Sequence, residues 1–73
     1  MNFEKHIEIN PLKRFGKPTI IGTRISVADI LNWLANDMSK SDITNDFPEI
    51  TEENINACLL YAASREGHIG IAS

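Results

Sequence analysis

A Gly-Lys pair followed by a hydroxyl residue is the first arrangement in this sequence that could do chemistry, because such residues bind phosphate in nucleotide-binding loops. The pair is Gly16-Lys17, and Thr19 follows it. A phosphate-binding loop also needs a glycine five residues before the pair, where this chain has Pro11. Pro18 lacks the backbone N–H that a phosphate cradle uses. The segment therefore does not predict a nucleotide site.

The other reactive residue types stand apart from one another. His6 and His68 have no nucleophile or carboxylate at a recognisable catalytic spacing. Cys58 is the single cysteine, which excludes an intrachain disulfide and argues against structural zinc. The acidic residues fall at expected helix ends and polar faces, where carboxylates are solvated or capping: Asp29, Asp37, Asp42, Asp46, Glu49, Glu52 and Glu53. We therefore expect no catalytic residues, metal or cofactor, and no enzyme.

Length and charge favour a binding protein. The 73 residues are expected to form a single domain, 1–73, whose small core needs support from self-association or a partner. Residues 1–25 hold five Lys or Arg and two Glu, a net +3, whereas residues 26–73 hold two and eight, a net −6. This split indicates two faces with different partners, although solvated surface of random sign explains it equally well. No apolar run approaches the roughly 18 residues of a membrane span. We expect no membrane contact and a cytoplasmic location.

Regular signals divide the chain into a β-rich N-terminal segment (1–25), a three-helix region (26–66) and a C-terminal tail (67–73). Residues 7–9 and 19–21 have strand character, with turn residues between them, and predict a short hairpin. Three hydroxyl residues then stand three positions before Asp or Asn, as in N-terminal capping boxes: Ser26/Asp29, Ser39/Asp42 and Thr51/Asn54. They predict helices over 27–36, 40–47 and 52–65, with a left-handed stop at residues 36–37. The fold class is α-rich α+β, a short N-terminal β-hairpin followed by a three-helix, helix-turn-helix-like bundle.

Several apolar side chains lie off the expected helix stripes and are candidates for a protein interface. Residues 55, 58, 59 and 62 form the expected core stripe of the last helix. The candidates are Trp33, Leu60 and Tyr61, with Ile69 and Ile71 in the tail. The alternative is that the hairpin or the tail covers these residues within one chain.

The first two helices have the proportions of a helix-turn-helix motif. DNA contacts would then come from the second helix and from the basic N-terminal segment. The candidates are Lys13, Arg14, Lys17, Arg24, Ser39, Lys40, Ser41, Thr44 and Asn45. A reading helix at 52–65 would bring Glu52 and Glu53 against phosphates, which is unfavourable. Helical packing without DNA contact is an equal alternative.

The sequence resembles the domain of unknown function 433 family in several blocks. They are Asn10-Pro11, the run from Gly16 to Ile20, the run from Gly22 to Val27, and Phe47-Pro48 with Ile50-Thr51. The resemblance implies a VapB-type antitoxin with a helix-turn-helix fold, which binds a PIN-like toxin ribonuclease and, as a homodimer, operator DNA. It carries over no catalytic residue. Asp37 stands where family members often have glycine.

The expected function is therefore that of an antitoxin, which neutralises a PIN-like ribonuclease by direct binding and represses its own operon. Two rival hypotheses remain open. One is a stand-alone helix-turn-helix regulator, which requires steeply salt-dependent DNA binding. The other is a protein-interaction subunit without a nucleic-acid role, which depends on Trp33, Leu60 and Tyr61.

Overall fold

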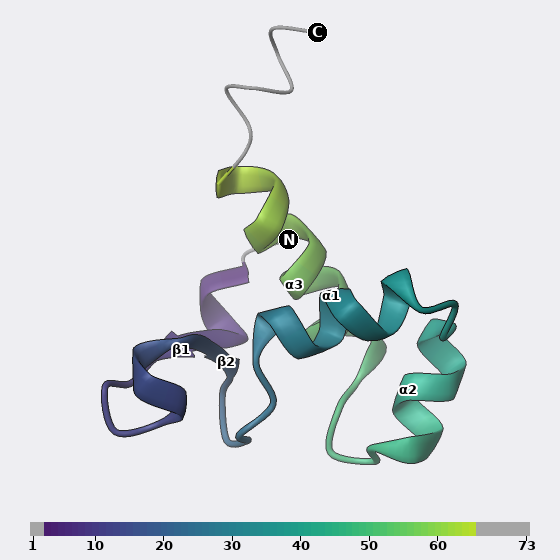
Figure 1. Cartoon of the computed structure of the whole chain (residues 1–73), viewed down its shortest axis with the longest axis horizontal. Coiled ribbons are helices and arrows are strands. Elements are labelled where there is room, and N and C mark those ends of the chain that lie inside the picture. Colours follow the sequence, from purple (N-terminus) through teal and green to yellow (C-terminus); the bar gives the residue numbers. More distant parts are fainter. Residues whose placement is uncertain (1–2, 66–73) are drawn as a thin grey trace, which may run out of the picture.

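The computed structural model describes residues 3–65. Two short strands and two 3-10 turns precede three α-helices, which confirms the expected α-rich α+β class. The elements are η1 (Phe3–Lys5), β1 (Ile7–Ile9), η2 (Arg14–Gly16), β2 (Pro18–Ile20), α1 (Val27–Ala35), α2 (Lys40–Asp46) and α3 (Glu52–Arg65). In Figure 1 the hairpin lies at one end of the molecule, α2 lies at the other end, and α1 runs between them.

The strands β1 and β2 form an antiparallel hairpin in which Ile7 pairs with Ile20. A second turn then brings Ser26 beside Thr19 in an isolated bridge. The Thr23 N–H donates to the Ile20 carbonyl at 3.0 Å, while Gly22 has a φ of 82°. A side chain disfavours this left-handed conformation, which accounts for a glycine at this turn. The chain thus leaves the hairpin directly into α1.

The three helices begin at the expected hydroxyl residues. At α1 the Ser26 Oγ accepts from the Asp29 N–H and the Asp29 carboxylate accepts from the Ser26 N–H, both at 3.0 Å. The same reciprocal pair forms between Ser39 and Asp42 at α2. It forms again between Thr51 and the Asn54 amide before α3. Each pair satisfies backbone donors that the first helical turn leaves unpaired, so local sequence sets all three starts.

The turn between α1 and α2 is a left-handed helix stop, as expected for residues 36–37. Asp37 has a φ of 69°. The Met38 N–H donates to the Trp33 carbonyl at 3.1 Å, and the Asp37 N–H donates to the Leu34 carbonyl at 3.2 Å. This is the Schellman pattern, which usually places glycine at the left-handed position. Asp37 adopts this left-handed conformation although its Cβ makes the conformation less favourable than it is for glycine.

One core joins the hairpin to all three helices. It contains Ile20, Val27, Ile30, Ile43, Ile50, Ile55 and Cys58. Ile20 comes from β2, whereas Ile50 comes from the loop before α3. Branched aliphatic side chains from five segments therefore hold the small domain together, because their burial removes apolar surface from water.

The buried side of α3 differs from the expected stripe. Leu59 was expected in the core but is 39% exposed, whereas Ala57 is fully buried. The reason is η1, which packs on α3 and brings Phe3 edge-to-face against Tyr61, with ring centroids 5.6 Å apart. The N-terminal turn therefore shifts the covered side of α3 towards Tyr61 and away from Leu59. Within residues 3–65, none of the helices has the length and hydropathy to span a membrane.

Candidate interaction surface

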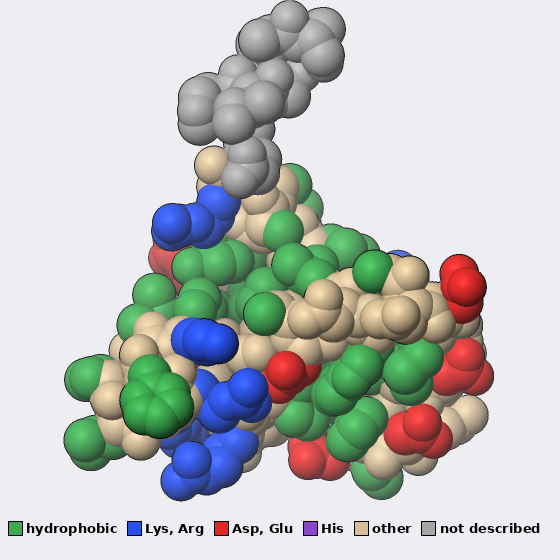
Figure 2. Space-filling view, viewed as in Figure 1, with side chains coloured by type: hydrophobic (Ala, Val, Ile, Leu, Met, Phe, Trp, Pro, Cys, Tyr) green, Lys and Arg blue, Asp and Glu red, His purple; other side chains and the backbone are tan. Residues whose placement is uncertain are grey.

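Three apolar side chains, at the end of β1 and in its connection to β2, are exposed to solvent. Phe15 is 100% exposed, Leu12 is 88% exposed and Ile9 is 62% exposed. We call residues 9–16, which carry these side chains, the hairpin tip. Figure 2 shows hydrophobic side chains at this end of the molecule beside Lys and Arg side chains. Exposed aromatic and aliphatic side chains gathered beside charged ones are typical of interaction sites.

The backbone of the hairpin tip has an unusual conformation. Three consecutive residues are left-handed, with φ values of 49° at Arg14, 59° at Phe15 and 80° at Gly16. The Gly16 N–H donates to the Lys13 carbonyl at 2.9 Å, and the Asn10 side chain accepts from the Leu12 N–H at 2.9 Å. For residues other than glycine, the left-handed region costs roughly 1–2 kcal/mol each. The tip therefore retains unfavourable conformations at Arg14 and Phe15.

Arg14 ties the hairpin tip to the start of α1. Its guanidinium donates to the Asp29 carboxylate and to the Arg24 carbonyl, both at 2.9 Å. Partial burial raises the pKa of Asp29, but the hydrogen bond from the Ser26 N–H and the Arg14 charge outweigh it. The net result is a pKa below the usual value. One carboxylate therefore caps α1 and also anchors the tip.

The cations predicted to bind DNA in the N-terminal segment have different surroundings. Arg14 is occupied by Asp29, and Lys13 forms an ion pair with Glu8 at 3.2 Å. Lys17 and Arg24 are exposed, and neither side chain forms an ion pair or hydrogen bond with residues 3–65. Of the four cations predicted to bind DNA in this segment, Lys17 and Arg24 are therefore available to contact an anionic partner.

The DNA-binding candidates of α2 lie at the opposite end of the molecule (Figure 1). Ser39 caps the helix, and Lys40 donates to the Asn56 side chain at 2.7 Å. Thr44 donates to the Ser41 carbonyl at 3.1 Å, and Asn45 is exposed. The exposed carboxylates around this helix are Asp37, Asp42, Asp46 and Glu49. The structure thus does not join the two predicted DNA-binding sets, and the α2 surface is acidic.

The predicted protein-interface residues also do not form one surface in the described part of the chain. Trp33 is half-buried and stacks on Phe47, with centroids 4.5 Å apart and planes 5° apart. Tyr61 is half-buried beneath Phe3. Leu60 is 40% exposed, and Ile69 and Ile71 lie outside the described residues.

The hairpin tip is not among the interface residues predicted from the sequence. Its signal was Leu12 and Phe15, two large apolar residues within a turn-rich segment between strands.

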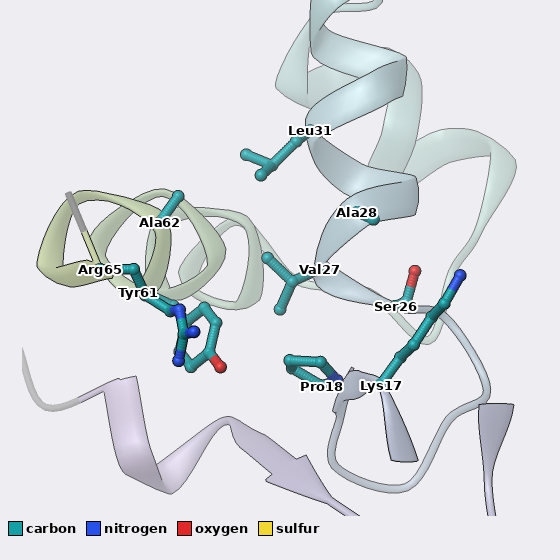
Figure 3. A pocket seen from close by; sticks show the side chains of 9 residues that line it. All are labelled: Lys17, Pro18, Ser26, Val27, Ala28, Leu31, Tyr61, Ala62 and Arg65. Carbon is teal, nitrogen blue, oxygen red and sulfur yellow. The ribbon is translucent and has the colours of Figure 1, made fainter. Parts of the chain in front are cut away.

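An apolar groove of about 490 Å³ opens between β2, α1 and α3 (Figure 3). Pro18 lines it from β2, Val27 and Leu31 line it from α1, and Tyr61 and Ala62 line it from α3. Lys17 and Arg65 contribute the charged side chains of its lining. The Arg65 guanidinium lies 5.9 Å from the centre of the Tyr61 ring. The groove therefore combines an apolar lining with two cations.

The cysteine and the histidine of the described part of the chain lie in packed or hydrogen-bonded surroundings. Cys58 is buried, which raises the pKa of its thiol to about 11 and keeps it protonated at neutral pH. His6 Nδ1 lies 3.1 Å from the Asn54 amide nitrogen. Across residues 3–65, no three His, Cys, Asp or Glu side chains cluster closely enough to hold a metal ion. The Thr19 hydroxyl is buried without a hydrogen-bond partner among these residues.

Comparison with known proteins places the chain among relatives of the same fold. A crystal structure of a DUF433 member protein from Anabaena variabilis ATCC 29413 is similar, with a TM-score of 0.78 and 23% sequence identity. The alignment covers 90% of this chain and 65% of that one, so this chain spans about two thirds of its neighbour's length. A search of curated proteins found no match. Residues 7–62 match the profile of a protein family of unknown function, DUF433, and the chain belongs to that family.

Proposed function

We propose that this protein is a non-enzymatic binding protein of the antitoxin type, which neutralises a PIN-like ribonuclease by direct contact. The observation that carries the proposal is the fully exposed Phe15 of the hairpin tip, held outward by a left-handed backbone. Conformations that cost stability persist where the surrounding structure enforces them, and they cluster at functional sites. An aromatic anchor beside cations is also the composition of energetically dominant contacts between proteins.

A ribonuclease assay tests the proposal, with a PIN-like protein whose gene lies next to the gene for this protein. We expect an equimolar amount of this protein to inhibit cleavage of a single-stranded RNA substrate. Phe15→Ser should weaken the complex by about 30-fold or more, the effect of losing an anchor residue. Leu59→Ser is the comparison variant, because it removes another exposed apolar side chain, from α3 and outside the hairpin tip. Absence of a complex with the wild-type chain contradicts the antitoxin assignment.

Operator binding is a second candidate function, supported by Lys17 and Arg24 at the hairpin end, two cations that form no ion pair with residues 3–65. The proposed DNA contact is made by this end and not by α2, because exposed carboxylates surround α2 and would repel phosphates. A homodimer would present two such ends, and linking two weak contacts raises the overall affinity.

This second function is tested by measuring, at several salt concentrations, the binding of a DNA duplex from the promoter of the protein's own gene. We expect the double variant Lys17→Ala/Arg24→Ala to lose affinity and to reduce the slope of log affinity against log salt by about 2. The matched double variant Ser41→Ala/Asn45→Ala should bind as wild type. The opposite result would restore α2 as the reading helix. No DNA binding at any salt concentration would leave a protein-interaction role alone.

A further inference from the structure

The groove between α1 and α3 has two similar walls. On α1, Ala28 is followed one turn later by Leu31, and on α3, Ala62 is followed one turn later by Arg65. All four side chains border the groove (Figure 3). A small residue on each wall lets another backbone approach closely, and the larger residues form ridges that can pack between a neighbour's side chains. The walls thus have the relief that a third helix would fit.

The backbone chemistry of these walls favours a helix over an extended peptide. Within a helix the backbone N–H and C=O groups bond to each other, so α1 and α3 offer few backbone partners to an added strand. The nearest strand, β2, pairs with β1 on one side and is bridged through Thr19 to Ser26 on the other. Binding here therefore relies on side-chain packing, the mode in which an amphipathic helix lies in an apolar groove.

The charges at the groove select the occupant further. Lys17 and Arg65 line it, and none of the carboxylates within residues 3–65 does. In Figure 2 hydrophobic side chains lie between Lys and Arg side chains on this face, whereas most acidic side chains lie towards the α2 end. A second copy presenting the same face would bring cations against cations. An acidic partner gains a complementary potential, which favours both encounter and specificity.

We propose that this groove binds an acidic amphipathic helix of the ribonuclease partner, with its apolar face against Val27, Leu31 and Ala62. Carboxylates on the flanks of that helix would meet Lys17 and Arg65. The inference rests on the proposed function and adds the contact surface and the partner's chemistry. The hairpin tip, which ends one residue before Lys17, would extend the same contact beyond the groove.

Two exposed alanines of α1 give a matched test. Ala28 lines the groove, whereas Ala35 lies at the end of the same helix and outside the lining. Ala28→Gln should fill the groove and weaken binding of the purified ribonuclease at least about tenfold by calorimetry. Ala35→Gln should bind within about twofold of wild type, since surface substitutions away from a contact change little. Circular dichroism and thermal unfolding confirm that both variants fold.

Charge reversal provides the second measurement. Lys17→Glu combined with Arg65→Glu should weaken the complex and flatten its dependence on salt, whereas Lys5→Glu, outside the groove, should change neither. If Ala28→Gln and the charge reversal bind as wild type while Phe15→Ser does not, the antitoxin function stands and the groove proposal is wrong.

Two further outcomes overturn the groove proposal. If wild type binds no ribonuclease, the proposed function fails, and the groove proposal fails with it. Sedimentation in which Ala28→Gln converts a wild-type dimer to monomer, with ribonuclease binding unchanged, would show that the occupant is a second copy.

Discussion

The hairpin end and the helical body of this small domain follow opposite rules. In the body, each helix starts at a cap, and Ile30, Ile43 and Ile55 are completely buried. In the hairpin end, Phe15 is fully exposed and the backbone at Arg14 and Phe15 is left-handed. The body thus agrees with local propensity at most positions, whereas the hairpin tip conflicts with it.

This difference supports the proposal that the body supplies stability and the hairpin end supplies binding. Natural sequences keep local preference and global fold in agreement, and departures concentrate at functional sites. The tip is nevertheless held in place, because Arg14 joins it to the cap of α1 through a hydrogen bond to Asp29. The body therefore supplies the free energy that holds the tip in its unfavourable conformation.

The largest contrast is expected from truncating one isoleucine in each region. Ile30→Ala should lower the free energy of unfolding by about 2–5 kcal/mol, because Ile30 is fully buried and a cavity remains. Ile9→Ala removes the same atoms from a side chain that is 62% exposed and should change stability by less than about 0.5 kcal/mol. Urea unfolding of both variants measures the difference. Similar losses would show that the tip is covered in the folded protein.

The link between the two regions gives the next effect. Asp29→Ala removes the cap contact and the anchor of Arg14 together and should cost about 1–2 kcal/mol. Asp42→Ala, in the equivalent but exposed box of α2, should cost about 0.5–1 kcal/mol because no cation is lost.

A double-mutant cycle between Arg14→Ala and Asp29→Ala isolates the ion pair. We expect a coupling of a few tenths of a kcal/mol up to about 1 kcal/mol, since both side chains are partly exposed. Equal costs for Asp29→Ala and Asp42→Ala, with zero coupling, would mean that the tip is not held through α1.

Low pH should weaken the interaction between Asp29 and Arg14 and lower the stability that it contributes. The pKa of Asp29 is lower in the folded chain than in the unfolded one, so folding favours the ionised form. Its contribution is complete above the unfolded value, near pH 4, and is lost as the pH falls through the folded value. Wild type should therefore lose more stability than Asp29→Asn between about pH 5 and pH 2. Parallel curves would assign the acid sensitivity to other carboxylates.

Most of the body could be predicted from the sequence, because its signals are local. Hydroxyl caps at Ser26, Ser39 and Thr51 placed the helix starts correctly, and the left-handed stop was found at Asp37. The exposure of Leu59 was missed, because it depends on the distant η1 segment packing against α3. Sequence periodicity describes one helix and contains no information on which neighbour covers it.

The interaction surface was less predictable for the same reason. The left-handed backbone at Phe15 depends on an anchor between Arg14 and Asp29, fifteen positions apart. The groove depends on the packing of α1 against α3, two helices far apart in the sequence, which both contribute to its lining. The two DNA-binding candidate sets, within residues 13–24 and 39–45, were predicted to act together but lie at opposite ends of the fold (Figure 1).

The smallest predicted effect separates strain that serves the fold from strain that serves binding. Asp37→Gly and Phe15→Gly both place glycine at a left-handed position, with φ values of 69° and 59°. Each should stabilise the protein by about 0.5–1 kcal/mol, as relief of the Cβ clash exceeds the added freedom of the unfolded chain.

Binding of the proposed ribonuclease partner should distinguish the two glycine variants. Asp37→Gly should bind as wild type, since its turn only ends α1, whereas Phe15→Gly should bind at least about tenfold more weakly despite its greater stability. Thermal unfolding and calorimetry together measure the pair. Unchanged binding by Phe15→Gly would mean that the left-handed tip merely closes the hairpin. Weaker binding would show that the domain retains an avoidable cost in stability in order to present one aromatic side chain.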